Sequence, residues 1–278
     1  MRKRKFRFRP MELLGKLCVL AYAVALTIPL YFVLITAFKT EQERVVNPIG
    51  LPIKATLESF ARAWTEGNLF RASINSITIS FGTTILLLCN IVLVSYCINR
   101  IRDTRIGIAI YMYILSSMFI PGVGTVTRLV LRRDLGLYNN LWGEIFCGAL
   151  GIATGVFLTT GFLRTIPRDL EEAAMLDGAT DTQICVKVIV PVIRPALVTV
   201  AIQAFTGTWN DVLGAMLTLR SEKLYTIPMA LMLNFSNEIS VNYAITFAGV
   251  VMTCIPIIIV YCKCQKYFVS AMSGSVKG

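Results

Sequence analysis

Six long runs of apolar residues limit what this chain can fold into. They cover roughly residues 17–38, 72–97, 106–126, 142–163, 196–219 and 242–261. Each run is about 20 residues or longer, which is the length an α-helix needs to cross the hydrocarbon core of a bilayer. Because 55% of the residues are hydrophobic and 15% are charged, the chain has too little polar sequence for a soluble domain. The pattern predicts an all-α integral membrane protein with six transmembrane helices.

The polar segments between these runs give the expected organisation. In order, we expect a basic N-terminus at 1–16, a first transmembrane helix at 17–38, a loop on the opposite side at 39–71, a core of five further helices at 72–261 and a tail at 262–278. A polar segment at 164–194 separates the fourth and fifth runs of this core and is called the elbow below. Six crossings would leave both termini and the elbow on the same side of the membrane.

The basic residues are distributed unequally between the two sides. The termini, the elbow and the tight link 98–105 hold 17 of the 27 Lys and Arg residues, and the opposite segments, of nearly equal total length, hold 10. The positive-inside rule therefore predicts that both termini and the elbow are cytoplasmic. The net charge of +11 does not indicate a nucleic-acid partner, because the basic residues flank the ends of apolar runs.

The first half of the elbow contains start and stop signals for a short helix. Pro167 suits a first helical turn, and Asp169 with Glu172 three residues later has the spacing of a capping box. Gly178 can end this helix by adopting a left-handed backbone conformation. Between these signals lie the small residues Ala173 and Ala174, which let another surface approach the backbone closely.

The second half of the elbow repeats the start signal. Thr180 with Gln183 again has capping-box spacing, so a second helix can start at once. We expect this helix to run as far as Pro191. The segment is therefore predicted to be two short helices joined by a tight turn outside the membrane.

The elbow resembles the EAA loop of the membrane subunits of binding-protein-dependent ABC importers. That loop has Glu-Ala-Ala, three residues, Gly, nine residues and then Ile-x-Leu-Pro. The matching positions here are Glu172, Ala173, Ala174, Gly178, Val188, Val190 and Pro191. The two valines replace Ile and Leu with little change in size or polarity. Trp209 to Asp211 and the stretch Leu135 to Asn139 also resemble this family, in its carbohydrate-uptake branch, and the resemblance covers nearly the whole chain.

The resemblance implies a fold and a role for the elbow. It implies the type I ABC importer permease fold, with six transmembrane helices and an elbow that is the coupling helix docking into a groove of the ATPase. The residues implied in ATPase coupling are Glu171, Glu172, Ala173, Ala174, Leu176, Asp177, Gly178, Ala179 and Pro191. Pro191 would lead into the fifth transmembrane helix.

The resemblance also implies a function and partners. The chain would be a permease subunit of an ATP-driven importer for a sugar or oligosaccharide in a bacterial-type plasma membrane. It would form half of the translocation pathway, beside a second homologous permease, a dimer of ATPase subunits and an external solute-binding protein. The chain has no Gly-x4-Gly-Lys-Ser/Thr phosphate loop, so we expect ATP and magnesium on the ATPase and no cofactor here. The absence of His excludes histidine-based catalysis and metal binding.

Three consecutive polar or aromatic residues lie in the fifth run, namely Trp209, Asn210 and Asp211. A charge near the middle of a membrane helix costs about 2.5–3.5 kcal/mol on insertion scales, so Asp211 should face protein, water or a partner. Amide, carboxylate and aromatic groups suit a hydroxyl-rich solute, which makes the three candidates for the substrate pathway. The alternative is a hydrogen bond or ionic contact within the subunit pair. Glu144 is expected near an external helix end, solvated and without a role.

Other functions stay open at this point. Related permeases also carry polyols or glycerol-phosphate-type solutes, so the solute cannot be identified from the residues. A self-sufficient secondary carrier would need several polar sites at membrane depth, and a membrane enzyme would need clustered acids or a nucleophile beside a base. Asp211 is the one charged residue that lies clearly at that depth, which favours the importer over both.

Overall fold

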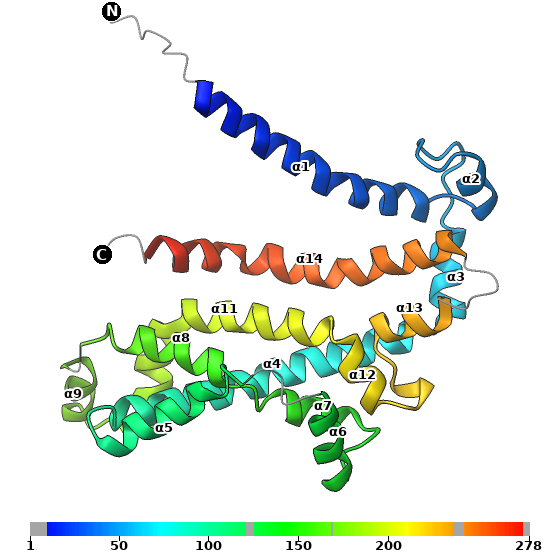
Figure 1. Cartoon of the computed structure of the whole chain (residues 1–278). Coiled ribbons are helices and arrows are strands. Elements are labelled where there is room, and N and C mark those ends of the chain that lie inside the picture. The colour runs from blue at the N-terminus through cyan, green and yellow to red at the C-terminus, as the bar shows by residue number, and fades with distance from the viewer. Residues whose placement is uncertain (1–9, 121–124, 168, 236–241, 275–278) are drawn as a thin grey trace, which may run out of the picture. The chain divides into compact units, whose positions relative to one another are not determined.

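The computed structural model describes residues 10–120, 125–167, 169–235 and 242–274, and every regular element within these ranges is helical (Figure 1). The elements are α1 (Pro10–Ala37), α2 (Glu41–Val46), α3 (Glu58–Glu66), α4 (Leu69–Arg100), α5 (Arg105–Ser116), α6 (Thr125–Asp134), α7 (Leu141–Gly148), α8 (Ala153–Leu163), α9 (Asp169–Leu176), α10 (Asp181–Gln183), the π-helical η1 (Ile184–Ile189), α11 (Val190–Trp209), α12 (Val212–Thr218), the 3-10 turn η2 (Glu222–Leu224), α13 (Ile227–Phe235) and α14 (Tyr243–Gly274). The prediction of an all-α protein is confirmed.

The chain divides into two compact units. Unit 1 consists of Met1–Gly67 and Asn234–Met252, and unit 2 of Asn68–Leu233 and Thr253–Gly278. In unit 1, the rings of Phe32 on α1 and Phe247 on α14 meet edge to face at 5.7 Å. Lys39 is fully buried there and donates from Nζ to the Asn47 carbonyl at 2.6 Å, which closes the end of α2.

Unit 2 is organised around α4, which packs along α11, α8 and α7. Its core includes Leu87 and Ile91 from α4 together with Val156 from α8 and Val200 from α11. A Cβ added at Gly155 would lie 2.1 Å from Ile91 Cδ1, so this glycine lets α8 approach α4 closely. Such close contacts between small residues hold helices together where lipid provides no hydrophobic driving force.

Four helices in the described part of the chain are long and apolar enough to cross a membrane. They are Leu14–Ala37, Leu69–Arg100, Asp181–Trp209 and Tyr243–Lys263. A fifth crossing is formed if α7 and α8, which bend by 41° at a short break, are counted as one span. The predicted third span, 106–126, corresponds to the 12-residue apolar helix α5, and residues 121–124 lie outside the described ranges.

Two expected helix boundaries on either side of the fifth span are wrong. The second elbow helix does not end at Pro191 but continues through η1 into α11 as one helix, 181–209. Pro191 has no N–H for the regular ladder, and the π-helical turns of η1 lie directly before it. The predicted span 196–219 is not one helix, because α11 ends at Trp209 and α12 begins at Val212.

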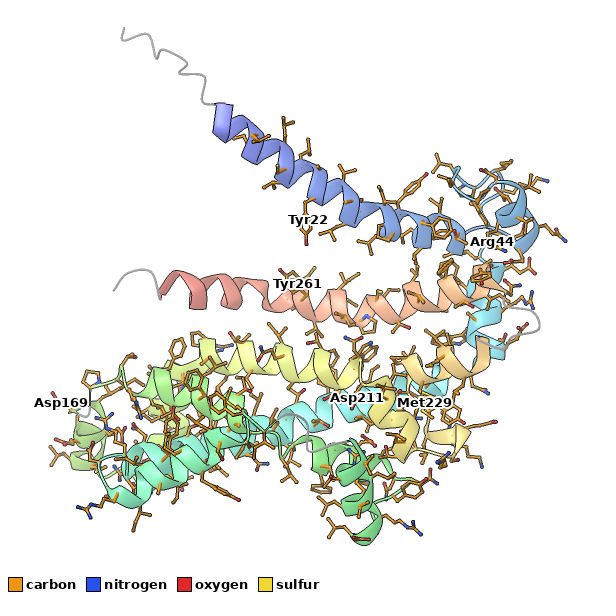
Figure 2. All side chains as sticks on the ribbon, in the orientation of Figure 1. Tyr22, Arg44, Asp169, Asp211, Met229 and Tyr261 are labelled. Atoms are coloured by element: carbon orange, nitrogen blue, oxygen red, sulfur yellow. The ribbon has the colours of Figure 1, made fainter. Side chains whose placement is uncertain are left out.

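The elbow helix α9 and the pair α7 and α12 lie toward opposite ends of unit 2 (Figure 1). Figure 2 shows the same separation through two labelled residues, Asp169 on α9 and Asp211 before α12. Since α4 runs between these ends, it connects the two regions to which the sequence assigned functional residues.

Candidate functional site

The turn of the elbow has the geometry that its glycine predicts. Gly178 has a φ of +80°, in the left-handed region. Its N–H donates to the Met175 carbonyl at 3.0 Å, and the N–H of Ala179 donates to the Ala174 carbonyl at 3.0 Å. These two bonds form a Schellman motif, which satisfies carbonyl groups at the end of α9. No heavy atom lies within 4 Å of a Cβ placed on Gly178, so its backbone conformation, and not space, requires glycine.

The second elbow helix begins with a capping box, as predicted. Gln183 N–H donates to Thr180 Oγ1 at 3.4 Å, and Thr180 N–H donates to Gln183 Oε1 at 2.9 Å. The predicted box at the start of α9 includes Asp169 as the cap. In the structure Asp169 is already the first residue of α9, and residue 168 before it lies outside the described ranges. The left-handed turn at Gly178 and the capping box at Thr180 together fix the angle between the two elbow helices, α9 and α10.

The residues assigned to ATPase coupling divide into an outer and an inner set. Those exposed to solvent are Glu172, Ala173, Leu176, Asp177, Gly178 and Pro191. Leu176 is 90% exposed. Ala174 and Ala179 are half-buried against the apolar cluster formed around Leu163 and Ile184.

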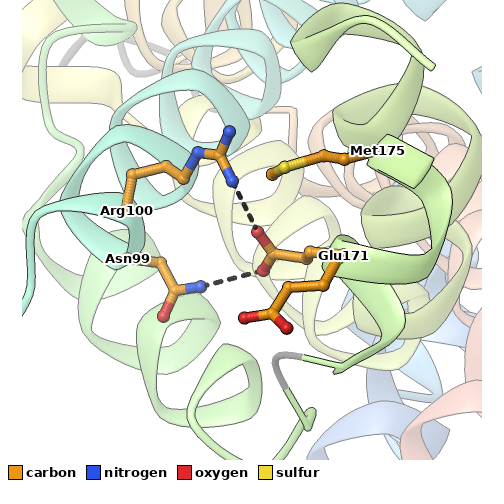
Figure 3. Close-up of a pocket in the computed structure, with 5 residues that line it drawn as sticks. Asn99, Arg100, Glu171 and Met175 are labelled. Carbon is orange, nitrogen blue, oxygen red and sulfur yellow. Dashed lines mark hydrogen bonds and ion pairs between the residues drawn. The ribbon is translucent and has the colours of Figure 1, made fainter. Parts of the chain in front are cut away.

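Glu171 belongs to the inner set and is buried, at 7% exposure. Asn99 Nδ2 donates to Glu171 Oε1 at 3.3 Å, and Arg100 Nη1 donates to Glu171 Oε2 at 3.5 Å (Figure 3). Arg100 Nη2 also donates to Asp181 Oδ1 at 2.5 Å, at the start of α10. Asn99, Arg100 and Asp181 were not among the predicted site residues. The sequence does contain a signal for this cluster. Arg100 follows the second apolar run, on the same predicted side of the membrane as the acidic residues of the elbow.

The second candidate region surrounds a cavity of about 580 Å³ in unit 2. Its lining residues come from α4, α6, α7, α11, the α7–α8 break and the α11–α12 break. They are Thr83, Leu87, Arg132, Glu144, Gly148, Gly151, Gln203, Ala204, Gly207, Thr208, Asn210 and Asp211. Most of these side chains are polar or absent, so the cavity offers hydrogen-bonding groups. A hydroxyl-rich molecule needs such groups when it leaves water.

Two of the three predicted pathway residues line this cavity and the third does not. Asn210 and Asp211 face it, whereas Trp209 is buried and its ring stacks on Phe205 with centroids 5.6 Å apart. Asp211 lies at the helix break, where Oδ1 accepts from the Gly214 N–H at 2.9 Å and caps α12. The break explains how a carboxylate is tolerated here, because the free N–H groups of a helix start stabilise negative charge.

The expectation for Glu144 is wrong. Glu144 is 8% exposed and accepts a hydrogen bond from Arg132 Nη1 at 2.6 Å and another from the Thr218 hydroxyl. The Arg132 side chain is itself 6% exposed. The ion pair connects α6 with α7, and the Thr218 hydrogen bond adds α12. Both partners of the ion pair line the cavity. The signal was an arginine on the predicted external side, followed 12 residues later by a glutamate in an apolar run.

Known proteins resemble the chain over nearly its full length. A family model described as binding-protein-dependent transport system inner membrane component matches residues 91–273. The melibiose/raffinose/stachyose import permease protein MelC of Bacillus subtilis is 31% identical over 99% of this chain and 100% of that protein. The probable ABC transporter permease protein YurM of the same organism is 30% identical over 92% of this chain and 86% of that protein. One chain in the crystal structure of a bacterial ABC transporter involved in alginate import aligns with a TM-score of 0.81 at 25% identity, covering 95% of this chain and 100% of that chain.

Proposed function

The chain belongs to the inner membrane components of binding-protein-dependent transport systems, and on this premise we propose that it is the permease subunit of an ATP-driven importer of a sugar or oligosaccharide. Its closely related full-length homologue MelC is a permease for melibiose, raffinose and stachyose, and this full-length match is the observation that carries the solute class. The cavity supports the same class, because Asn210, Asp211 and Gln203 present amide and carboxylate groups to a solute rich in hydroxyls.

The elbow is the part that couples transport to an ATPase. Glu172, Ala173 and Leu176 form its outer face, and all three are exposed in the isolated chain. A glutamate beside small and apolar residues suits a groove with a basic rim and an apolar floor. The ATPase subunits bind the ATP and magnesium, and the present chain carries out no covalent chemistry.

The proposed complex has four further components. They are a second homologous permease that completes the pathway, two ATPase subunits and an external solute-binding protein. The complex lies in a bacterial-type plasma membrane with both termini and the elbow in the cytoplasm, which the excess of Lys and Arg on those segments supports. The loaded binding protein docks outside, ATP closes the motor, and the cavity changes the side on which it opens.

A pull-down from detergent-solubilised membranes tests the proposal. The native chain should retain a phosphate-loop ATPase and a second permease. Glu172→Lys and Gly178→Glu should lose the ATPase and keep the second permease, because both changes alter the outer face or the turn of the elbow. Glu222→Lys, the same change of charge on an exposed residue of η2, is the matched control and should lose neither.

Transport by the reconstituted complex then tests the solute class. We expect ATP-dependent uptake of a neutral oligosaccharide such as raffinose into vesicles. If the chain is recovered alone and moves solute without ATP, it is a secondary carrier and the proposal is wrong.

A further inference from the structure

The guanidinium group of Arg100 joins three segments of the chain. Arg100 is the last residue of α4, and its side chain lies over the Tyr96 ring at 5.8 Å. From there Nη1 reaches Glu171 on α9 and Nη2 reaches Asp181 on α10, at 3.5 Å and 2.5 Å. The planar guanidinium group of Arg100 therefore holds both elbow helices, α9 and α10, against the end of α4. This arrangement uses the geometry that distinguishes arginine from lysine.

Besides this polar cluster, α9 packs against η1 through the apolar cluster around Leu163 and Ile184. Glu171 is its one buried residue, and Ala174 is its contribution to the apolar cluster around Leu163 and Ile184. An alanine side chain buries little apolar area. Both carboxylate oxygens of Glu171 are bound by α4, one by Asn99 and the other by Arg100. The attachment of α9 to α4 therefore depends mainly on this polar cluster.

The other part of α4 reaches the cavity. Thr83 and Leu87 of α4 line it, and Thr83 is 17 residues before Arg100 in the same helix. At 1.5 Å per residue, this separation is about 25 Å along the helix axis. Because α4 is an unbroken helix, a displacement applied at Arg100 moves the wall of the cavity instead of being absorbed in a flexible joint.

We propose that Arg100 is a positioning residue for transport, which fixes the coupling helix α9 to α4 so that movement of the ATPase is transmitted to the cavity. This inference rests on the proposed function. The outer face of α9 contacts the motor, and its inner face, through Glu171, is bound to α4. Without Arg100 the elbow still docks, but α9 can tilt about the turn at Gly178 and α4 no longer follows it.

The experiment is a coupling measurement on the whole complex, with its ATPase, partner permease and solute-binding protein, in proteoliposomes. The quantity measured is the number of raffinose molecules imported per ATP hydrolysed. The variants are Arg100→Gln, Arg100→Lys, Glu171→Gln and the double variant of Arg100→Gln with Glu171→Gln. Arg105→Gln is the matched control, since Arg105 lies in the same short link, is exposed, and is not part of the cluster.

We expect Arg100→Gln to retain the ATPase in a pull-down and to lower the coupling ratio by about fivefold or more, the range typical of communication between two sites. Arg100→Lys should lie between native and Arg100→Gln, because a single ammonium replaces the two-pronged fork. The double variant should lower the ratio by less than the two single variants combined, since Arg100 and Glu171 share one contact. Arg105→Gln should match the native ratio.

Two outcomes overturn the inference while leaving the proposed function intact. In the first, Arg100→Gln imports as many molecules per ATP as the native complex. In the second, Arg100→Gln loses the ATPase from the complex, which makes Arg100 a docking residue. Failure of the proposed function is distinguishable from both, because then the native complex itself imports no sugar with ATP.

Discussion

Unit 2 contains two Arg–Glu clusters that join helices in different ways. In the Arg132–Glu144 pair the side chains are 6% and 9% exposed and the closest atoms are 2.6 Å apart. In the Arg100–Glu171 pair the arginine side chain is 34% exposed and the distance is 3.5 Å. The first pair lines the cavity, and the second lies at the base of the elbow.

The difference in burial predicts a difference in role. Removing one partner of a buried pair leaves an uncompensated charge and costs about 3–5 kcal/mol. Removing Arg100 should cost less, because its own side chain is partly exposed and the buried Glu171 keeps its hydrogen bond from Asn99. Removing one partner of the Arg132–Glu144 pair should therefore destabilise the protein strongly. The Arg100 cluster should contribute little to stability and act instead on how helices move together. The predictions below run in order of decreasing effect on stability, with the two clusters at the extremes and the elbow turn between them.

The largest effect is expected for Glu144→Leu. This change leaves Arg132 buried without its carboxylate, so the free energy of unfolding should fall by about 3–5 kcal/mol. Denaturant unfolding of the protein in detergent measures it. The control is the double variant of Glu144→Leu with Arg132→Met, which removes both charges and should recover most of the loss. Equal instability of the single and double variants would show that the packing around the pair, and not its charge, carries the stability.

A smaller effect is expected at the turn of the elbow. Gly178→Ala should lower stability by about 1–2 kcal/mol, because an L-residue at a φ of +80° is strained and no neighbouring atom hinders the added Cβ. Gly178→Asn should cost less, since asparagine tolerates this conformation. Unfolding in detergent compares the two variants. If the alanine and asparagine variants are equally destabilised, the backbone conformation is not the cause.

The next smaller effect on stability is expected at the capping box before α10. Thr180→Ala removes the acceptor for the Gln183 N–H and should cost about 1 kcal/mol. The loss should be local, seen as faster amide hydrogen exchange in the first turn of the helix and not in α4. Thr180→Ser keeps the hydroxyl and should exchange at the native rate. Faster exchange in both variants would mean that the methyl group of Thr180, and not its hydroxyl, stabilises the turn.

Local features of the structure could be predicted from the sequence, and contacts between distant residues could not. The elbow signals are local: Gly178 and the Thr180–Gln183 pair act within a few residues, and both appear in the structure as expected. The Arg132–Glu144–Thr218 and Arg100–Glu171–Asp181 clusters connect residues up to 81 positions apart. Their partners depend on how α6 packs with α7 and α12, and α4 with α9 and α10, which no local pattern encodes.

Asp211 was predicted only in part. Its polarity within an apolar run predicts that it faces a cavity or a polar partner, and it does line the cavity. The helix break beside it was not predicted, because the run 196–219 remains apolar on both sides of Asn210. Trp209 was assigned to the same surface from its position in the motif. Neighbouring residues near a helix end point in different directions, and Trp209 packs on Phe205 instead.

The smallest effect on stability, and the sharpest test of the contrast, is expected for Arg100→Gln. Its side chain is partly solvated, so the variant should unfold within about 1 kcal/mol of the native protein in detergent. The Arg105→Gln variant provides a comparison, since Arg105 lies in the same link and is exposed. If Arg100→Gln is instead destabilised as strongly as Glu144→Leu, the two clusters have the same structural role and loss of transport would only reflect loss of folded protein. If its stability is native and its coupling ratio is lowered, the exposed cluster transmits motion while the buried pair maintains the fold.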